Sequence, residues 1–270
     1  MYNATATMYG EKMINRAKCG LEYIPIVNTT LNEKFGILPF ENNPDMFYPK
    51  INLLTIGAGL RGTDNTATRL NLMSSPHSPI DAALFEHIPF YIRKTSEVDI
   101  YPPSPKLKLK KTMLIDSIEY TVYYGYEVTN YEAKDDILTF TGIENEYVNI
   151  SSLNLSELDV LNPTPKANVD LTTIIKNYVS DFIKIYTLFS TSELNEIINA
   201  FNIIKPGEPP IIKEVGVCFS KTFDTGNNYI ENIQTQIMYF LDVDENLNDA
   251  LEVGKLDFYI ELGNMKMVVI

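Results

Sequence analysis

Residues 113–131 read MLIDSIEYTVYYGYEVTNY, and this stretch decides the fold class. It is rich in the β-branched and aromatic side chains that half-buried, pleated strands favour. The pattern predicts a hairpin or one long bent strand, and residues 137–140 and 147–150 predict further short strands. Before it, residues 106–111 alternate lysine with leucine. This alternation predicts a strand with a solvated lysine face, because charge on an edge strand blocks unwanted pairing.

Further upstream, two more strands and a short helix are predicted. Residues 47–56 predict a buried strand, and a glycine-rich turn follows at residues 57–62. Residues 80–87 predict two helical turns that Pro89 ends, and residues 90–93 predict a short strand.

The helical signal is strongest between residues 170 and 204. Apolar side chains recur at helical spacing over residues 170–189. Residues 190–193 have the spacing of a capping box, which predicts a second helix that ends before Pro206. We expect these two helices to form a pair joined by a short connection.

Strand patterns return after the helices. The runs at residues 211–219, 233–243 and 256–270 predict strands, and the last keeps an alternating apolar face. The sequence therefore predicts an α+β fold, mainly antiparallel β-sheet, with one helical pair at about residues 170–204.

Breaks in the pattern divide the chain into three segments. Residues 1–46 are polar and interrupted by prolines, which predicts an N-terminal arm or loop-rich segment with a short strand at residues 21–27. Residues 47–162 predict a β-rich domain. Residues 166–270 carry the helical pair and a sheet, which form a separate domain or pack with residues 47–162 as one. The proline-rich break at residues 162–165 is the candidate boundary.

Composition and charge exclude several partners. The formal net charge is −13, whereas nucleic-acid binders carry basic patches, so we expect no nucleic-acid partner. We expect no signal peptide and no membrane insertion, because no apolar stretch is long enough. Because copies of this acidic chain repel one another, any self-assembly must depend on specific contacts. Cys19 and Cys218 lie far apart, and two buried free thiols are expected rather than a disulfide.

Catalytic groups are scarce. The chain has two histidines and two cysteines, which removes many common nucleophile, metal and proton-relay schemes. Gly57, Gly59 and Gly62 match a dinucleotide-binding spacing, but no helix pattern follows, so they indicate a turn at a strand end. His77 and His87 lack two further zinc ligands and are interpreted as surface or capping residues. We expect a protein that is not an enzyme and has no cofactor or metal.

The 17 tyrosines are the positive signal. Tyrosine combines apolar area with a polar tip, which suits partly wet protein interfaces. Half-exposed sheets favour tyrosine as well, so both interpretations stay open.

Residues 75–93 read SPHSPIDAALFEHIPFYIR. This stretch resembles a segment of virion structural proteins from tailed bacteriophages, in which a glycine-rich turn precedes the histidine. The matching residues are His77, Pro79, Asp81, Ala82, Ala83, Leu84, Phe85, His87, Pro89, Phe90 and Arg93, with Gly57 and Gly59 upstream.

Two later stretches carry the same resemblance. Residues 211–217 read IIKEVGV, which is similar to a strand of phage tail and baseplate proteins and contains Glu214 and Gly216. Nearer the C-terminus, Tyr229 and Glu231 belong to a stretch that resembles the closing strands of that family.

The resemblance implies a non-enzymatic structural subunit of a bacteriophage virion, in the tail or baseplate, assembled in the host cytoplasm. Its partners would be other virion subunits and copies of itself. A neck or head-completion protein and a receptor- or carbohydrate-binding module stay open as alternatives, although the absence of tryptophan counts against sugar binding. Asp81 is expected to form a structural bond to an arginine or to the backbone.

Overall fold

The computed structural model describes residues 3–21, 30–37, 50–59, 77–141, 175–225 and 229–268. The chain forms two compact units. The main unit comprises Met1–Thr129 and Leu188–Leu256, and the smaller unit comprises Asn130–Thr187 and Asp257–Ile270. The predicted boundary at residues 162–165 lies outside the described residues, as do the strand expected at 147–150 and most of that at 21–27.

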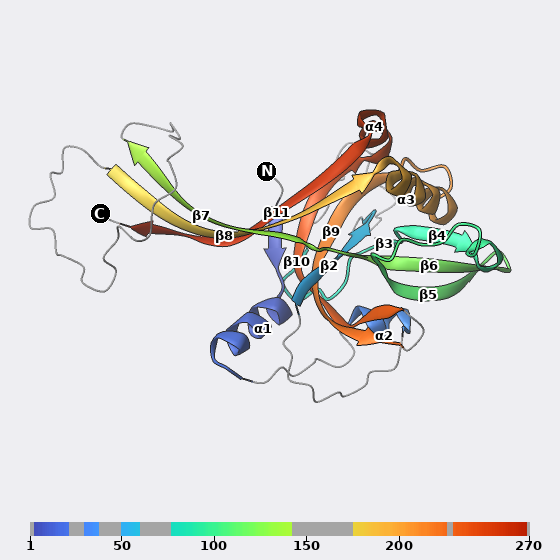
Figure 1. Ribbon diagram of the computed structural model, residues 1–270, viewed down its shortest axis with the longest axis horizontal. Coiled ribbons are helices and arrows are strands. Elements are labelled where there is room, and N and C mark those ends of the chain that lie inside the picture. The colour runs from blue at the N-terminus through green and yellow to red at the C-terminus, as the bar shows by residue number, and fades with distance from the viewer. Residues whose placement is uncertain are drawn as a thin grey trace, which may run out of the picture. The chain divides into compact units, whose positions relative to one another are not determined.

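The main unit is built on an antiparallel sheet (Figure 1). Its described strands run in the order β1–β10–β9–β2–β6–β4, with β3 beside β2 and β5 beside β6. Their bounds are β1 (Asn3–Ala6), β2 (Lys50–Gly57), β3 (His87–Ile88), β4 (Tyr91–Lys94), β5 (Leu107–Ile115), β6 (Ile118–Glu127), β9 (Ile211–Asp224) and β10 (Ile230–Asn246). The strands predicted at residues 90–93, 106–111, 211–219 and 233–243 are confirmed, as is the described part, residues 50–56, of the strand predicted at 47–56.

Residues 113–131 form a hairpin rather than one bent strand. β5 and β6 pair antiparallel as far as Ile115 and Ile118. Asp116 and Ser117 connect them, with φ angles of 49° and 66°. Left-handed backbone at both turn residues matches the right-handed twist of the strands, which is why a two-residue connection closes this hairpin.

The second predicted helix is confirmed as α3 (Thr191–Ile204). The Ser190 side chain accepts a hydrogen bond from the Glu193 N–H, and the Glu193 carboxylate accepts one from the Ser190 N–H. This capping box satisfies donors that a helix start leaves free. Its buried residues are Leu194, Ile197, Ala200 and Phe201, which recur at helical spacing.

The first predicted helix is wrong, and so is the helical pair. Residues 175–190 form a strand, β8 (Ile175–Ser190), which pairs antiparallel with β7 (Asn130–Thr141). Ile185 and Phe189 are buried, while Tyr186 and Leu188 are exposed. Residues four apart share a face in a helix and also in a strand, so this spacing fitted both. The β-branched and aromatic content and the pairing with β7 favour the strand.

The two helical turns predicted at residues 80–87 are also wrong. The segment forms turns and bends before β3. The Phe85 and Glu86 N–H groups donate to the Glu214 carboxylate on β9 rather than to carbonyls one turn earlier. A buried acceptor elsewhere in the fold therefore overrides the local helical preference.

The N-terminal segment is more regular than the predicted loop-rich arm. After β1, which pairs with β10, it forms α1 (Met8–Lys18) and α2 (Leu31–Phe35). The Thr7 hydroxyl caps α1 by accepting from the Gly10 N–H, and it donates to the Ile237 carbonyl of β10. Neither cysteine forms a disulfide; Cys19 is exposed just beyond α1, so the expectation of two buried thiols holds only for Cys218.

Three further elements complete the described structure. The strand predicted at residues 256–270 is confirmed as β11 (Lys255–Val268), and the three-stranded sheet has the order β11–β8–β7. The 3₁₀ helix η1 (Thr95–Glu97) and the helix α4 (Leu247–Val253) belong to the main unit. No described helix is long and apolar enough to cross a membrane.

Candidate functional site

Glu214 on β9 is a buried carboxylate with hydrogen bonds to both of its oxygens. Oε1 accepts from the Gly59 N–H at 3.1 Å and the Glu86 N–H at 3.0 Å. Oε2 accepts from the Phe85 N–H at 3.1 Å and lies 2.7 Å from His77 Nε2. The residue is only 2% exposed. Glu214 therefore joins the sheet to two separate loops.

His77 is enclosed on both ring faces. Its imidazole stacks between the rings of Phe85 and Phe240, with centroid distances of 4.0 and 3.8 Å. Its Nδ1 lies 3.4 Å from Asp81 Oδ2, and Oδ2 also accepts from the Ser78 N–H at 2.8 Å. The interpretation of His77 as a surface or capping residue is wrong, because its side chain is 1% exposed. The cost of burying its polar nitrogens is offset by the two carboxylates.

The glycines make room for this carboxylate. A Cβ atom on Gly57 would lie 2.3 Å from Glu214 Oε1, and one on Gly59 would lie 2.2 Å from it. On β9, a Cβ on Gly216 would lie 2.5 Å from the Thr55 hydroxyl oxygen. Gly57 and Gly59, the first two glycines of the dinucleotide-like spacing, thus permit a close approach of backbone to a buried side chain, and Gly62 lies outside the described residues. We call Gly57, Gly59, His77, Asp81, Phe85 and Glu214 the Glu214 cluster.

His87 lies beside this cluster but has a different role. Its Nε2 accepts from the Leu84 N–H at 3.1 Å, and its ring packs edge-on against Phe35. Burial holds the pKa of His87 well below 6.5, and the positive charges of Lys34 and His77 lower it further. His87 is therefore a neutral acceptor. Among the described residues, no three His, Cys, Asp or Glu side chains are placed to hold a metal ion.

Arg93 lies outside the Glu214 cluster. Its guanidinium forms an ion pair with Glu196 of α3 at 2.5 Å and lies over the rings of Tyr91 and Tyr101. Of the two bonds expected for Asp81, the structure therefore has the one to the backbone. Pro89 lies between β3 and β4, and Arg93 lies on β4.

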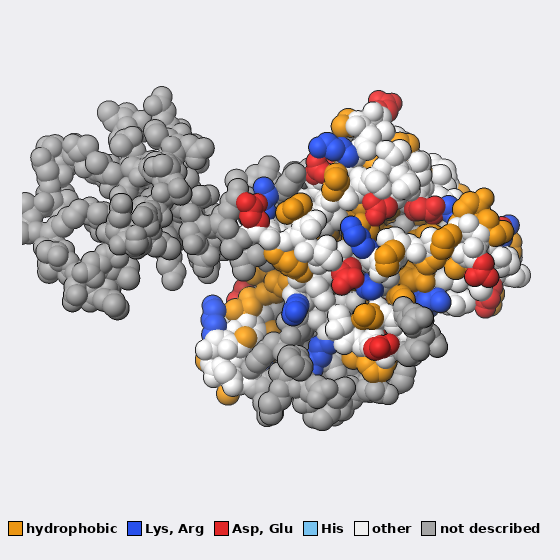
Figure 2. Space-filling model, in the orientation of Figure 1, with side chains coloured by type: hydrophobic (Ala, Val, Ile, Leu, Met, Phe, Trp, Pro, Cys, Tyr) orange, Lys and Arg blue, Asp and Glu red, His pale blue; other side chains and the backbone are white. Residues whose placement is uncertain are grey.

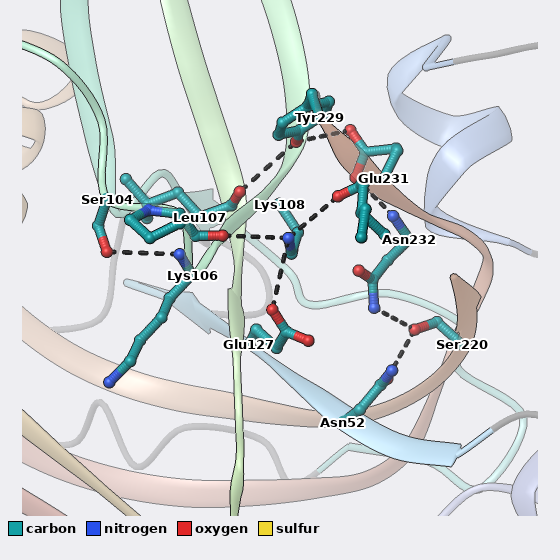
Figure 3. Close-up of polar contacts among 12 residues, drawn as sticks. Asn52, Ser104, Lys106, Leu107, Lys108, Glu127, Ser220, Tyr229, Glu231 and Asn232 are labelled. Carbon is teal, nitrogen blue, oxygen red and sulfur yellow. Dashed lines mark hydrogen bonds and ion pairs between the residues drawn. The ribbon is translucent and has the colours of Figure 1, made fainter. Parts of the chain in front are cut away.

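A second buried carboxylate, Glu231, was not predicted to form a site (Figure 3). Glu231 is 1% exposed. Its Oε1 accepts from the N–H groups of Leu109 and Asn232 at 2.8 and 2.7 Å. Its Oε2 accepts from the Lys110 N–H and the Tyr229 hydroxyl, both at 3.0 Å. Glu231 thus bonds β5 to β10.

Lys108 is buried beside Glu231 (Figure 3). Its ammonium donates to the carbonyls of Pro105 and Ile230, both at 3.0 Å, and lies 3.4 Å from Glu127 Oε2. The prediction of a solvated lysine face is therefore wrong for Lys108. The reason is that two carbonyls and a carboxylate surround the Lys108 ammonium, and their interactions with it compensate the cost of removing its charge from water.

A cavity of about 370 Å³ opens between α3 and the segment around β4. It is lined by Phe90, Tyr91, Ile100, Tyr101, Pro102, Ser104, Leu107, Tyr126, Phe189, Ser192, Glu193, Glu196 and Ile197. The Tyr126 hydroxyl donates to Glu193 Oε1 at 2.6 Å. Burial, and then Glu193, raises the pKa of Tyr126. Burial alone would raise the pKa of Glu193, but hydrogen bonds from Tyr126 and Ser190 lower it.

The two buried carboxylates are suited to holding the fold rather than to reacting. Each has four neighbouring donors, which match the lone pairs that two carboxylate oxygens offer. The buried thiol of Cys218 is equally unreactive, because burial raises its pKa to about 12. The α3–β4 cavity has the carboxylates of Glu193 and Glu196 in its wall.

Comparisons with known proteins give a family but no activity. No curated protein and no solved structure matches the chain. A family model described as a family of unknown function, DUF7208, matches residues 2–270. Since the match spans almost the whole chain, this protein belongs to the DUF7208 family.

Proposed function

We propose that this chain is a non-enzymatic structural subunit of a bacteriophage virion, in the tail or baseplate, that acts through protein–protein interfaces. The observation that carries the proposal is the convergence on Glu214 of several of the residues that carry the resemblance. His77, Asp81, Phe85 and the two glycines surround one buried carboxylate. A rigid scaffold accounts for the residues around Glu214 that this chain shares with the phage segment, and none of them has to act as a reactive group.

A saturated buried carboxylate favours a scaffold on physical grounds. Removing an ionised carboxylate from water is costly unless all its partners are in place, so Glu214 stabilises a single arrangement of its loops. A catalytic base needs a free lone pair near the substrate. Glu214 has described donors on both oxygens and is 2% exposed.

Exposed apolar side chains support an assembly role. Ile80, Ile100, Leu114 and Val253 are between 67% and 73% exposed. In Figure 2, hydrophobic and acidic side chains lie side by side over the region that α3 and β4 occupy in Figure 1.

Mass spectrometry of gradient-purified particles tests the proposal. The particles would be produced from the phage genome that encodes the chain. We expect the chain at a fixed ratio to the major particle proteins, and cryo-electron microscopy would then distinguish tail, baseplate and neck. Recovery of the chain only in the particle-free fraction of the lysate would contradict the proposal.

A further inference from the structure

The outer edge of β5 is an open edge of the main sheet. β5 pairs with β6 and with no other described strand (Figure 1). In a two-residue hairpin the residues that flank the turn, here Ile115 and Ile118, form a hydrogen-bonded pair. Such pairs alternate with non-bonded pairs along an antiparallel ladder, so Leu114 and Thr112 direct their N–H and C=O groups away from β6. These backbone groups can pair with a further strand.

Contacts at Lys110 agree with this alternation and mark where the open edge begins. The Lys110 N–H also points away from β6, and it donates to Glu231 Oε2 at 3.0 Å. Glu231 thus occupies the edge at Lys110, and the turn that starts at Asp116 ends it on the other side. Between them, no described residue forms a backbone hydrogen bond to the outward groups of Thr112 and Leu114. Residues 111–115 therefore remain as the accessible part of the edge.

Two lysines give this edge a positive charge. Lys110 is exposed and Lys111 is half-buried, and neither has an ion-pair partner among the described residues. Both line a hollow of about 480 Å³, together with Thr112. Glu231 also lines the hollow, but its two oxygens accept from four described donors. The unpaired charge in this hollow is therefore positive, in a chain whose formal net charge is −13.

We propose that the outer edge of β5 receives an extended acidic segment of another protein subunit, which adds to the sheet as a strand. Its backbone would bond to Thr112 and Leu114, and its carboxylates would lie beside Lys110 and Lys111. In this mode of recognition the backbone bonds supply affinity and the side chains supply specificity. Leu114 is 72% exposed, and a neighbouring strand would cover part of its apolar surface.

The same lysines disfavour pairing with a second copy of β5. Two β5 edges placed together would bring both pairs of lysines into one short interface, and like charges that are close across strands are destabilising. An acidic segment replaces this repulsion by attraction, so the charge selects the partner. Naming that partner as a virion subunit rests on the proposed function, but the binding of an acidic strand does not.

Fluorescence anisotropy with labelled peptides tests the proposal. The probe is a fluorescein-labelled peptide of about eight residues in which threonine and glutamate alternate, and a comparison peptide has lysine in place of glutamate. We expect the acidic peptide to bind saturably with a dissociation constant of about 10–100 µM at low salt. The lysine peptide should bind at least about tenfold more weakly. No saturable binding of the acidic peptide would overturn the proposal, and equal affinities would overturn an acidic partner.

A methylated peptide tests whether binding uses the backbone. Methylation of two adjacent central backbone nitrogens in the acidic peptide removes one N–H donor from each of its edges and leaves its charges unchanged. We expect this peptide to bind about tenfold more weakly, because hydrogen bonds to β5 are lost. Equal affinity of the methylated and unmethylated peptides would overturn strand pairing.

Variants of the chain test the location. Thr112→Pro removes an N–H that is outside the β5–β6 ladder, so the variant should fold, and binding should fall at least about tenfold. Lys110→Glu should weaken binding about tenfold, whereas Lys12→Glu, the same change at an exposed position of α1, should weaken it less than about twofold. Equal effects of the two charge variants would refute β5 as the site, even if Thr112→Pro failed to fold.

Light scattering distinguishes the possible occupants. We expect Thr112→Pro to have the same molar mass in solution as the natural protein. If the substitution instead abolishes self-association, the occupant is a second copy, which overturns a different subunit as partner. A chain that is missing from particles but binds the acidic peptide would overturn the proposed function alone. A chain that is present in particles but does not bind the peptide would overturn the β5 proposal alone.

Discussion

Glu214 Oε2 lies 2.7 Å from His77 Nε2, although 137 positions separate the two residues in the chain. The imidazole is fixed between two aromatic rings, and the carboxylate is fixed by three backbone N–H groups. The pair therefore clamps the segment before β3 onto β9. Variants that break the Glu214–His77 pair should therefore lower the free energy of unfolding.

The first prediction concerns the Glu214 carboxylate. Glu214→Gln keeps the shape but replaces an acceptor oxygen by a donor that faces N–H groups. We expect the free energy of unfolding to fall by about 3 kcal/mol, as measured by urea denaturation. Glu119→Gln, on the exposed part of β6, is the control and should change it by less than about 0.5 kcal/mol. Similar values for both variants would contradict a stabilising role for Glu214.

The second prediction concerns the close approach at Gly59. Gly59→Ala should destabilise the fold by about 2 kcal/mol, because the added Cβ would lie 2.2 Å from Glu214 Oε1. The same substitution in a Glu214→Ala background should cost much less, since the atom it meets is gone. A double-mutant cycle measures this coupling. Additive effects would show that Gly59 serves another purpose.

The third prediction concerns Lys108. Lys108→Met retains the alkyl chain but leaves the Pro105 and Ile230 carbonyls without their donor. We expect a loss of about 1–3 kcal/mol in the free energy of unfolding. Lys110→Met is the matched control, because the Lys110 side chain is exposed and only its backbone binds Glu231. A larger loss for Lys110→Met would contradict the buried network.

The fourth prediction concerns pH. Because the pKa of His87 is lowered in the folded state, the unfolded chain binds more protons below about pH 6.5. Stability should therefore fall as the pH drops below about 6.5, by at most about 1.4 kcal/mol per pH unit from this group. Asp242, whose pKa is raised chiefly by burial, acts in the opposite direction.

A variant isolates the contribution of His87. His87→Gln retains an acceptor for the Leu84 N–H but does not titrate. Urea denaturation at about pH 7.5 and about pH 5.5 should give a smaller loss for the variant than for the natural protein. An equal loss in both proteins would assign the pH dependence to other groups.

Local sequence was enough for several elements of the fold. The β5–β6 hairpin follows from its side-chain types and a two-residue turn, and α3 follows from a capping box and a helical apolar stripe. The helix predicted over residues 170–189 was wrong because Ile185 and Phe189, which are buried and four positions apart, fit the spacing of a helix and of a strand alike. Pairing with β7 joins residues that are 34 positions apart at Thr141 and Ile175 and 56 apart at Asn130 and Tyr186, so it is not a local property.

The sequence by itself determined the α+β class and singled out the 75–93 segment and Glu214. Only the tertiary structure decided that several residues of this segment surround Glu214, that Glu231 and Lys108 are buried, and that Arg93 pairs with α3. The physical reason is that propensity, capping and turn chemistry act over a few residues. A buried charge, in contrast, is stabilised only when distant strands bring its donors together, and residue spacing does not encode that pairing.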